Sequence, residues 1–196
     1  YWQESLSNKN VLELGAGVGV VGISLASVGA HVLLTDLPTL VENAIEPNLI
    51  RNETTNAETK CPQWLSTYSN AVSIHDGWAA TTPMDWNRPV EHQLTEKQKC
   101  PIDLIVASDC VFLVSMLNSL LDTVAEIFTS SPNASLLLSF QRRDAQDGDE
   151  SASFTTVNRV IKKVQARKWC MECLAWRPVV VGNDTSQVFV FEIRQL

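Results

Sequence analysis

The residues best suited to chemistry in this sequence begin with a glycine-rich loop at residues 13–19, ELGAGVG. Gly15, Gly17 and Gly19 carry no side chain, so the backbone can turn sharply there and approach a ligand closely. Asp36 ends the next apolar run, where a carboxylate can accept hydrogen bonds from ribose hydroxyls. Glycines followed at a distance by one acid are typical of a site for a nucleotide-like cofactor.

Two cofactor classes compete for this loop. Residues 17–22, GVGVVG, match the dinucleotide pattern GxGxxG, and Asp36 follows at about the expected spacing of roughly 20 residues. However, Gly15 directly follows the strand, so the dinucleotide frame begins too late for a pyrophosphate turn. Glu13 stands just before the glycines, where a carboxylate suits the cationic amino group of S-adenosylmethionine. We therefore expect S-adenosylmethionine; the plainer alternative is that the glycines only pack a helix on a sheet.

The elements that position this loop are indicated by alternating strand and helix patterns. Near-continuous apolar runs are typical of buried parallel strands, and Pro47 predicts a kink or break within the second helix. Strands are expected at 10–14, 31–35, 71–75, 102–107 and 135–140, helices at 18–28, from 38 onward, at 111–128 and at 154–168, and a closing antiparallel pair at 169–176 and 187–193. The sequence predicts a Rossmann-like, doubly wound, seven-stranded α/β sheet, mostly parallel, with a C-terminal antiparallel β-hairpin. Ligands of such sheets bind at the carboxyl ends of the strands.

Length and charge limit the class of protein. The 196 residues fit a single domain, and because the chain begins with Tyr1 instead of Met, we expect an upstream N-terminal segment to be missing. A formal charge of −7 argues against a broad nucleic-acid surface, which needs clustered Lys and Arg. No apolar run approaches the roughly 20 residues that span a membrane. We expect neither nucleic acid nor membrane as a partner.

The cysteines bear on location and metal binding. Five scattered cysteines are typical of reduced thiols in an intracellular protein, so we expect the cytoplasm, with the nucleus as the alternative. Cys170 and Cys173 have CxxC spacing, but they fall in an expected strand, where residues three apart point to opposite faces. We therefore expect no metal site.

Three stretches resemble known motifs. Residues 11–19, VLELGAGVG, resemble motif I of the seven-stranded S-adenosylmethionine-dependent (class I) methyltransferases. Residues 35–38, TDLP, followed by a helix with Asn48 and Asn52, are similar to the second-strand signature of one branch. Residues 103–112, DLIVASDCVF, resemble the same branch's fourth strand and its D-x-x-Y signature. On these motifs the chain is identified as a member of the methyltransferase-like protein-lysine methyltransferases, methyltransferase family 16.

The resemblance implies a reaction and a substrate. It implies methyl transfer to a lysine side-chain amine of a protein, such as a chaperone or translation factor, by an enzyme that we expect to be monomeric. Asp109 is the candidate for holding the incoming amine, although it can equally cap the helix expected from Val111. Ser108 is expected to contact the cofactor through its backbone. The alternatives are a small-molecule methyltransferase and a catalytically silent cofactor-binding interaction module.

The sequence departs from the family at two places. Phe112 stands where the family has an aromatic hydroxyl; it can wall an apolar channel for a lysine stem but cannot hydrogen-bond the amine. The family also has an Asp-Trp pair near the adenine, after the third strand. Asp76 and Trp78 stand there in altered order, and Asp85 and Trp86 repeat the pair further along. We favour Asp76 and Trp78, because they directly follow the expected strand.

Overall fold

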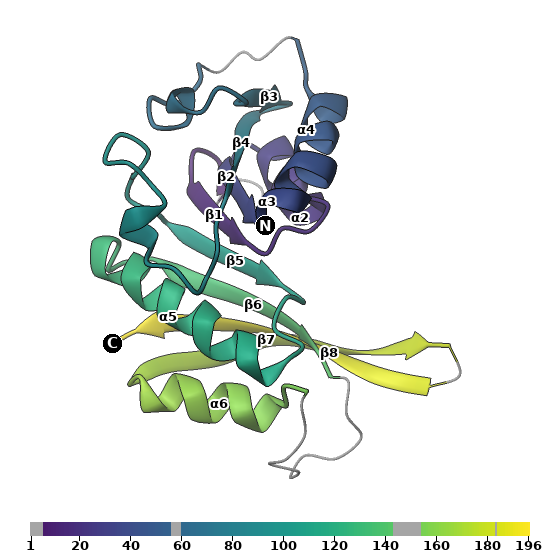
Figure 1. Cartoon of the computed structure of the whole chain (residues 1–196). Helices are drawn as coiled ribbons and strands as arrows, with labels where there is room; N and C mark the ends of the chain where they lie inside the picture. Colours follow the sequence, from purple (N-terminus) through teal and green to yellow (C-terminus); the bar gives the residue numbers. More distant parts are fainter. Residues whose placement is uncertain (1–5, 56–59, 143–153, 183) are drawn as a thin grey trace. The chain divides into compact units, whose positions relative to one another are not determined.

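The computed structural model describes residues 6–55, 60–142, 154–182 and 184–196 (Figure 1). The chain divides into two compact units, Tyr1–Val106 and Ala107–Leu196, and the expectation of a single domain stays a prediction. We expected an acidic, solvated loop at residues 141–153, and most of it lies outside the described residues. Eight strands occur in the described part, one more than the seven expected, and the α/β architecture is confirmed.

The first unit is built on a mostly parallel sheet. Its strands are β1 (Asn10–Leu14), β2 (His31–Asp36), β3 (Val72–Ile74), β4 (Gly77–Pro83) and β5 (Leu104–Ser108, whose last two residues belong to the second unit). They lie in the order β3-β4-β2-β1-β5 (Figure 1). The pairs β1–β2, β1–β5 and β2–β4 are parallel, and only β3 runs antiparallel to its neighbour β4. The carboxyl ends of β1, β2 and β4 therefore meet at one edge of the sheet.

Helices cover one face of this sheet. They are α2 (Val20–Ser27), α3 (Pro38–Leu40), a π-helical segment (Val41–Ile45) and α4 (Glu46–Asn52). They pack through a buried cluster that includes Val32 and Leu34 of β2, Ala26 of α2 and Leu49 of α4. Pro47, near the start of α4, cannot donate the helical hydrogen bond. The wider π-helical turn before it accommodates that missing donor, and this is the form that the expected break takes.

The third parallel strand is not where the sequence pattern placed it. We expected residues 71–75, but these contain only the short antiparallel β3, and the strand that pairs with β2 is β4. The threonines of β4 made it look like a polar loop. Thr81 is in fact 2% exposed, because its hydroxyl donates to the carbonyl oxygen of Leu34 at 2.9 Å. A satisfied hydroxyl can be buried at little cost, so polar residue type misled the prediction.

The described part of the second unit pairs three antiparallel strands with two helices. In chain order these are α5 (Val114–Ser130), β6 (Ser135–Gln141), α6 (Val157–Ala166), β7 (Trp169–Val181) and β8 (Asp184–Gln195). The strand order is β6-β8-β7, so the expected C-terminal hairpin is present and longer than predicted. Phe128 of α5 meets Trp169 of β7 edge to face, with ring centroids 5.0 Å apart.

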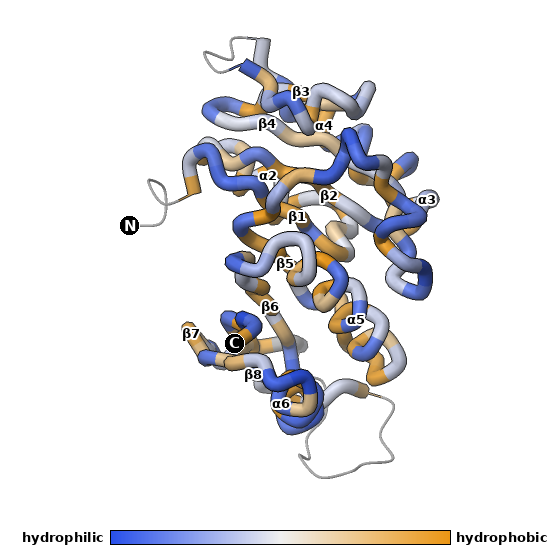
Figure 2. Tube along the Cα trace, turned by 90° about the vertical axis from the view of Figure 1, so that its left-hand side faces the viewer, coloured by the Kyte–Doolittle hydropathy of each residue, from blue (hydrophilic) through white to orange (hydrophobic). Residues whose placement is uncertain are grey.

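The helices of the second unit are amphipathic. Buried residues recur along α5 at Leu117, Leu121, Val124 and Phe128, and Figure 2 shows hydrophobic positions alternating with more hydrophilic ones along this helix. In the described residues, no helix combines the length and the apolar character needed to cross a bilayer.

Candidate active-site residues

The glycine loop connects the end of β1 to the start of α2. Gly15, Gly17 and Gly19 have φ values of 70°, 59° and 83°, the left-handed region that residues with a Cβ rarely adopt. The amides of Gly15 and Ala16 both donate to the carbonyl oxygen of Thr35 at 3.0 Å. A Cβ built on Gly17 would meet no atom within 4 Å, so the loop has open space beside this residue. The loop is therefore fixed to β2 and open where a ligand can approach.

Asp36 is hydrogen-bonded to the glycine loop. Its Oδ2 accepts from the amide of Gly17 at 2.8 Å, and its Oδ1 accepts from the amide of Leu37 at 2.7 Å. A carboxylate has about four lone-pair sites, so these two bonds leave room for ribose hydroxyls. The side chain is partly exposed. The loop and the acid thus form one structural unit, and the contact with a ribose stays a prediction.

Glu13 lies beneath the loop. Its side chain is 2% exposed, and its Oε2 accepts from the amide of Gly22, in the first turn of α2, at 2.9 Å. Burial raises the pKa of Glu13 to about 7; the hydrogen bond from Gly22 lowers it, and the negative charge of Asp36 raises it further. The carboxylate is thus turned toward α2, and a direct contact with a cofactor amine stays a prediction.

Protein stability is expected to fall with rising pH because of Glu13. Its pKa moves from 4.5, the ordinary value, to about 7 in the fold. Between these values the folded protein keeps a proton that the unfolded chain has lost, so the free energy of unfolding decreases as pH rises through this interval. The full loss is about 3 kcal/mol.

Glu13→Gln serves as the control for this pH dependence. The neutral amide can still accept from Gly22 through its oxygen, so the variant is expected to lack this part of the slope. Urea unfolding of both proteins from about pH 5 to about pH 8 measures the difference. Equal slopes in the two proteins would show that Glu13 titrates normally in the fold.

Asp76 and Trp78 lie at the wrong end of the sheet for the role that we predicted. Trp78 is opposite His31 in the β2–β4 register, at the amino end of both strands, and Asp76 precedes it. The glycine loop and Asp36 lie at the carboxyl end. The assignment of Asp76 and Trp78 to the cofactor is therefore corrected. It failed because the third parallel strand had been placed too early in the chain.

Asp85 and Trp86 lie after the third parallel strand, the position that we predicted for Asp76 and Trp78. They follow β4 directly, and the amide of Met84, just before them, donates to the carbonyl oxygen of Asp36 at 2.8 Å. The backbone of Asp85 exchanges two hydrogen bonds with the side chain of Gln93, at 2.8 and 3.0 Å. The signal was present in the sequence as an Asp-Trp pair in the family order.

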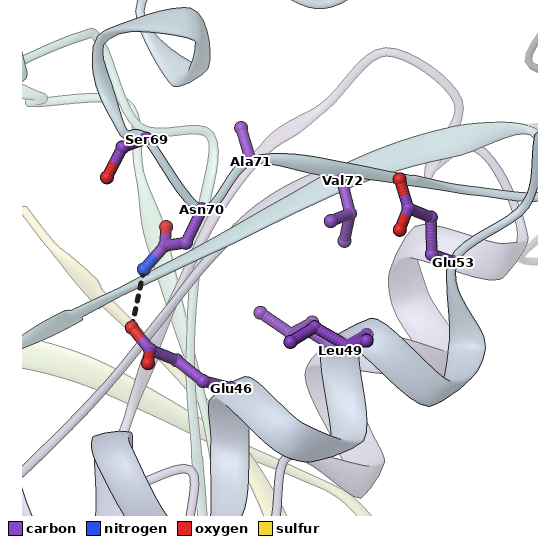
Figure 3. A pocket seen from close by; sticks show the side chains of 8 residues that line it. Glu46, Leu49, Glu53, Ser69, Asn70, Ala71 and Val72 are labelled. Atoms are coloured by element: carbon purple, nitrogen blue, oxygen red, sulfur yellow. Dashed lines mark hydrogen bonds between the residues drawn. The ribbon is translucent and has the colours of Figure 1, made fainter.

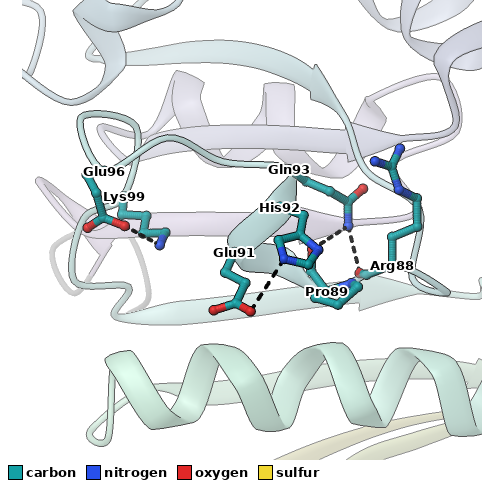
Figure 4. Close-up of polar contacts among 7 residues, drawn as sticks. All are labelled: Arg88, Pro89, Glu91, His92, Gln93, Glu96 and Lys99. Carbon is teal, nitrogen blue, oxygen red and sulfur yellow. Dashed lines mark hydrogen bonds and ion pairs between the residues drawn. The ribbon is translucent and has the colours of Figure 1, made fainter.

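Gln93 also holds the rest of the loop after β4. Its Nε2 donates to the carbonyl oxygen of Arg88 at 2.8 Å and approaches that of Pro89 at 3.4 Å (Figure 4). Further along, Lys99 bonds Glu96 at 2.5 Å, and Glu91 lies 3.6 Å from His92. Local contacts of this kind give the loop a defined path away from Asp85, although it is long for a connection in a compact domain.

In the second unit, Ser108 and Asp109 follow the core of β5. Asp109 has φ 52°, a left-handed conformation that is uncommon for a residue with a side chain. Its amide donates to the carbonyl oxygen of Ser139 at 2.9 Å, and its Oδ1 lies 3.4 Å from the amide of Gln141. Helix α5 begins only at Val114, with Leu113 at the N-cap position. The alternative role of Asp109 as a helix cap is therefore wrong.

Phe112 lies in an extended segment just before α5. The segment stays extended because Leu113 forms an antiparallel bridge with Phe154, and the carbonyl oxygen of Phe112 accepts from the amide of Thr155 at 2.8 Å. The Phe112 side chain is 37% exposed. It therefore lies at the surface of the second unit, and its place on the wall of a substrate channel stays a prediction.

A separate cavity lies between α4 and the segment before β3. Its volume is about 390 Å³, and Asn70 on one wall donates to Oε1 of Glu46 on the other at 2.9 Å (Figure 3). Leu49 and Val72 face each other across it. None of the predicted cofactor residues lines this cavity. It is a feature of α4 and its neighbouring strand, not of the glycine loop.

Comparison with solved structures identifies the class of protein that this fold defines. A solved S-adenosylmethionine-dependent methyltransferase from Methanosarcina mazei has a TM-score of 0.61 to this chain, with 16% sequence identity, over 97% of this chain and 94% of that one. The fold is that of the class I methyltransferases. A family described as lysine methyltransferase matches residues 2–159, and the chain belongs to this family. The expected family and its cofactor class, S-adenosylmethionine, are confirmed.

Individual relatives differ in the amino acid that they modify. Protein-lysine N-methyltransferase rrg1 of Schizosaccharomyces pombe is 35% identical over 113 residues, which are 57% of this chain and 32% of that protein. A histone-arginine methyltransferase of Xenopus laevis is 28% identical over 197 aligned residues, which are 98% of this chain and 73% of that protein. The chain thus spans about a third of the length of the first relative.

Proposed function

We propose that this protein transfers the methyl group of S-adenosylmethionine to the side-chain nitrogen of a lysine in a protein substrate. The observation that carries the proposal is the match of residues 2–159 to the lysine methyltransferase family. The glycine loop that is bound to Asp36 supports the cofactor, because it joins an open backbone turn to a carboxylate. A chaperone or a translation factor is the proposed substrate class, acted on by a monomer in the cytoplasm or the nucleus.

The residues that would hold the cofactor fit its chemistry. The left-handed turn at Gly15, Gly17 and Gly19 leaves open space beside Gly17 for close approach, and the free lone pairs of Asp36 suit ribose hydroxyls. Asp85 and Trp86 are proposed to flank the adenine, and the backbone of Ser108 to contact the cofactor. The bound cofactor would supply an activated methyl group on a sulfonium, so the protein's task is alignment and exclusion of water.

Asp109 and Phe112 are proposed to receive the target side chain. A free lysine has a pKa of about 10.4, and it must lose its proton before the nitrogen can act as a nucleophile. The apolar wall of Phe112 favours the neutral amine, whereas the carboxylate of Asp109 favours the charged form but fixes the position of the nitrogen. Asp109 would accept a hydrogen bond from the amine. This bond would turn the lone pair of the amine nitrogen away from the carboxylate.

Arginine is the second candidate target. The relative that aligns with 98% of this chain is named a histone-arginine methyltransferase, and Phe112 has no hydroxyl where the lysine-modifying family has one. A planar guanidinium has five N–H donors and can bond a carboxylate through two of them. Asp109 could therefore hold either side chain, and product analysis distinguishes the two.

Two measurements on the full-length protein test the proposed function. Calorimetric titration is expected to show binding of S-adenosylhomocysteine and none of NAD; NAD binding alone would refute the cofactor assignment. Incubation with radiolabelled methyl donor and a lysate of the source cells is expected to label a protein band. Acid hydrolysis of that band should yield methyl-lysine. Methyl-arginine would establish the second candidate, label in small molecules would establish a small-molecule enzyme, and no label would favour a silent binding module.

A further inference from the structure

Thr155 carries a buried hydroxyl without a hydrogen-bond partner among the described residues. The residue is 1% exposed, and its Oγ1 has no hydrogen-bond partner in the part of the chain that the structure describes. The next residue, Thr156, is 3% exposed, but its Oγ1 accepts from the amide of Arg159 as the N-cap of α6. Buried hydroxyls in folded proteins are nearly always paired, so the hydroxyl of Thr155 points to a partner outside the described residues, and a bound ligand can supply it.

The backbone places this hydroxyl beside Phe112. The bridge between Leu113 and Phe154 is antiparallel, and the amide of Thr155 donates to the carbonyl oxygen of Phe112 at 2.8 Å. This register makes Thr155 and Phe112 direct opposites. Opposite residues of an antiparallel pair have their side chains on the same face. The Thr155 side chain is buried on that face and Phe112 is 37% exposed, so a ligand that reaches the hydroxyl enters along the Phe112 ring.

The hydrogen-bonding groups near Phe112 in the sequence determine which chemical group of a ligand they can bind. The phenyl ring neither donates nor accepts a hydrogen bond, and Asp109, three residues earlier, offers only a carboxylate acceptor when ionised. A neutral primary amine has two N–H donors and one lone pair. The lone pair must face the methyl group, so both donors need acceptors elsewhere. Asp109 can take one of them, and the second acceptor has to come from another residue.

We infer that Oγ1 of Thr155 accepts the second hydrogen bond of the target nitrogen and fixes its orientation, in place of a hydroxyl on residue 112. This inference rests on the proposed function, because it assigns Thr155 to the nitrogen that receives the methyl group. Thr155 is then a substrate-positioning residue. Its hydroxyl stays unpaired until the target side chain enters along Phe112.

The fold and the reaction respond in opposite ways to the removal of this hydroxyl. Thr155→Val keeps the shape and deletes an unpaired group, so its Tm is expected to equal or exceed that of the wild type. Its kcat/KM with the labelled protein substrate is expected to fall about tenfold, the effect of one lost hydrogen bond. Thr155→Ser, which keeps the hydroxyl, should retain most of the activity.

Thr156 offers the matched control one residue away. Thr156→Val deletes a helix cap, so its Tm is expected to fall by several degrees while kcat/KM at a temperature where it is folded stays near the wild-type value. A lower Tm for Thr155→Val would show that the hydroxyl is paired in the folded protein, by a buried water or another group, and would overturn the inference. Unchanged kcat/KM for Thr155→Val would overturn it as well.

An amine probe separates this inference from the proposed function. Titration of the full chain with n-butylamine, followed by NMR of the labelled threonine methyl groups, is expected to shift the Thr155 signal and leave that of Thr156 in place. Wild type that methylates no protein but shows this shift would refute the proposed function and leave Thr155 only as a hydrogen-bond acceptor for a bound amine. Absence of the shift in a protein that methylates lysine would refute the role of Thr155 alone.

Discussion

Asp109→Ala is expected to lower kcat/KM for methyl transfer at least ~100-fold, while the affinity for S-adenosylhomocysteine changes less than about twofold. The carboxylate is positioned by the backbone: the amide of Asp109 donates to Ser139 and its φ is 52°. Loss of the group that orients the nitrogen misaligns the displacement without touching the glycine loop. Steady-state kinetics with the labelled substrate and calorimetry with S-adenosylhomocysteine measure the two quantities.

Two further substitutions at Asp109 separate strain from function. Asn adopts the left-handed conformation readily, so Asp109→Asn should keep the fold and lose mainly the charge. Asp109→Gly relieves a backbone cost of about 1–2 kcal/mol, so it should be more stable than the wild type and yet inactive. Higher stability together with lost activity is expected where backbone strain is maintained for function. Full turnover by Asp109→Ala would remove this residue from the mechanism.

The part of the site that the sequence predicted is the part fixed by local chain geometry. The glycines, the strand before them and Asp36 lie on two successive strand ends, and the structure joins them through the bond from Gly17 to Asp36. The buried position of Glu13 was not foreseen. Its carboxylate reaches Gly22, nine residues along the chain, because β1 and α2 fold against each other.

The parts that the sequence did not predict depend on contacts between distant residues. Residues 111–113 are apolar and directly precede the helical pattern, but Leu113 is held extended by Phe154, about forty residues later. No local pattern reveals that bridge, and it moves the start of α5 to Val114. Thr81 is similar, because only its bond to Leu34 on the neighbouring strand permits its burial. The threonines of β4 made this strand look like a loop. For that reason the third parallel strand was misplaced and Asp76 was wrongly assigned to the cofactor.

Gly77→Ala is expected to cost at least about 3 kcal/mol of unfolding free energy. Gly77 begins β4, and a Cβ there would lie 2.3 Å from the carbonyl oxygen of Ala30 and 2.4 Å from that of Ala26. Both are backbone atoms, so no side-chain rotation relieves the overlap, and β4 must move away from the end of α2. The movement would also strain the hydrogen bond from the Trp78 amide to the Ala30 carbonyl oxygen, 3.1 Å long.

Gly182→Ala is the matched control for this prediction. Gly182 has φ 65° but a Cβ there would meet nothing within 4 Å, so the substitution should cost only the backbone strain of about 1–2 kcal/mol. Urea unfolding of the two variants and the wild type compares a steric cost with a conformational one. Equal losses would mean that β4 and α2 are not closely packed at Gly77. A larger loss at Gly77 would show that this glycine, between Asp76 and Trp78, serves the packing of the sheet. It does so at the end of the sheet opposite the glycine loop.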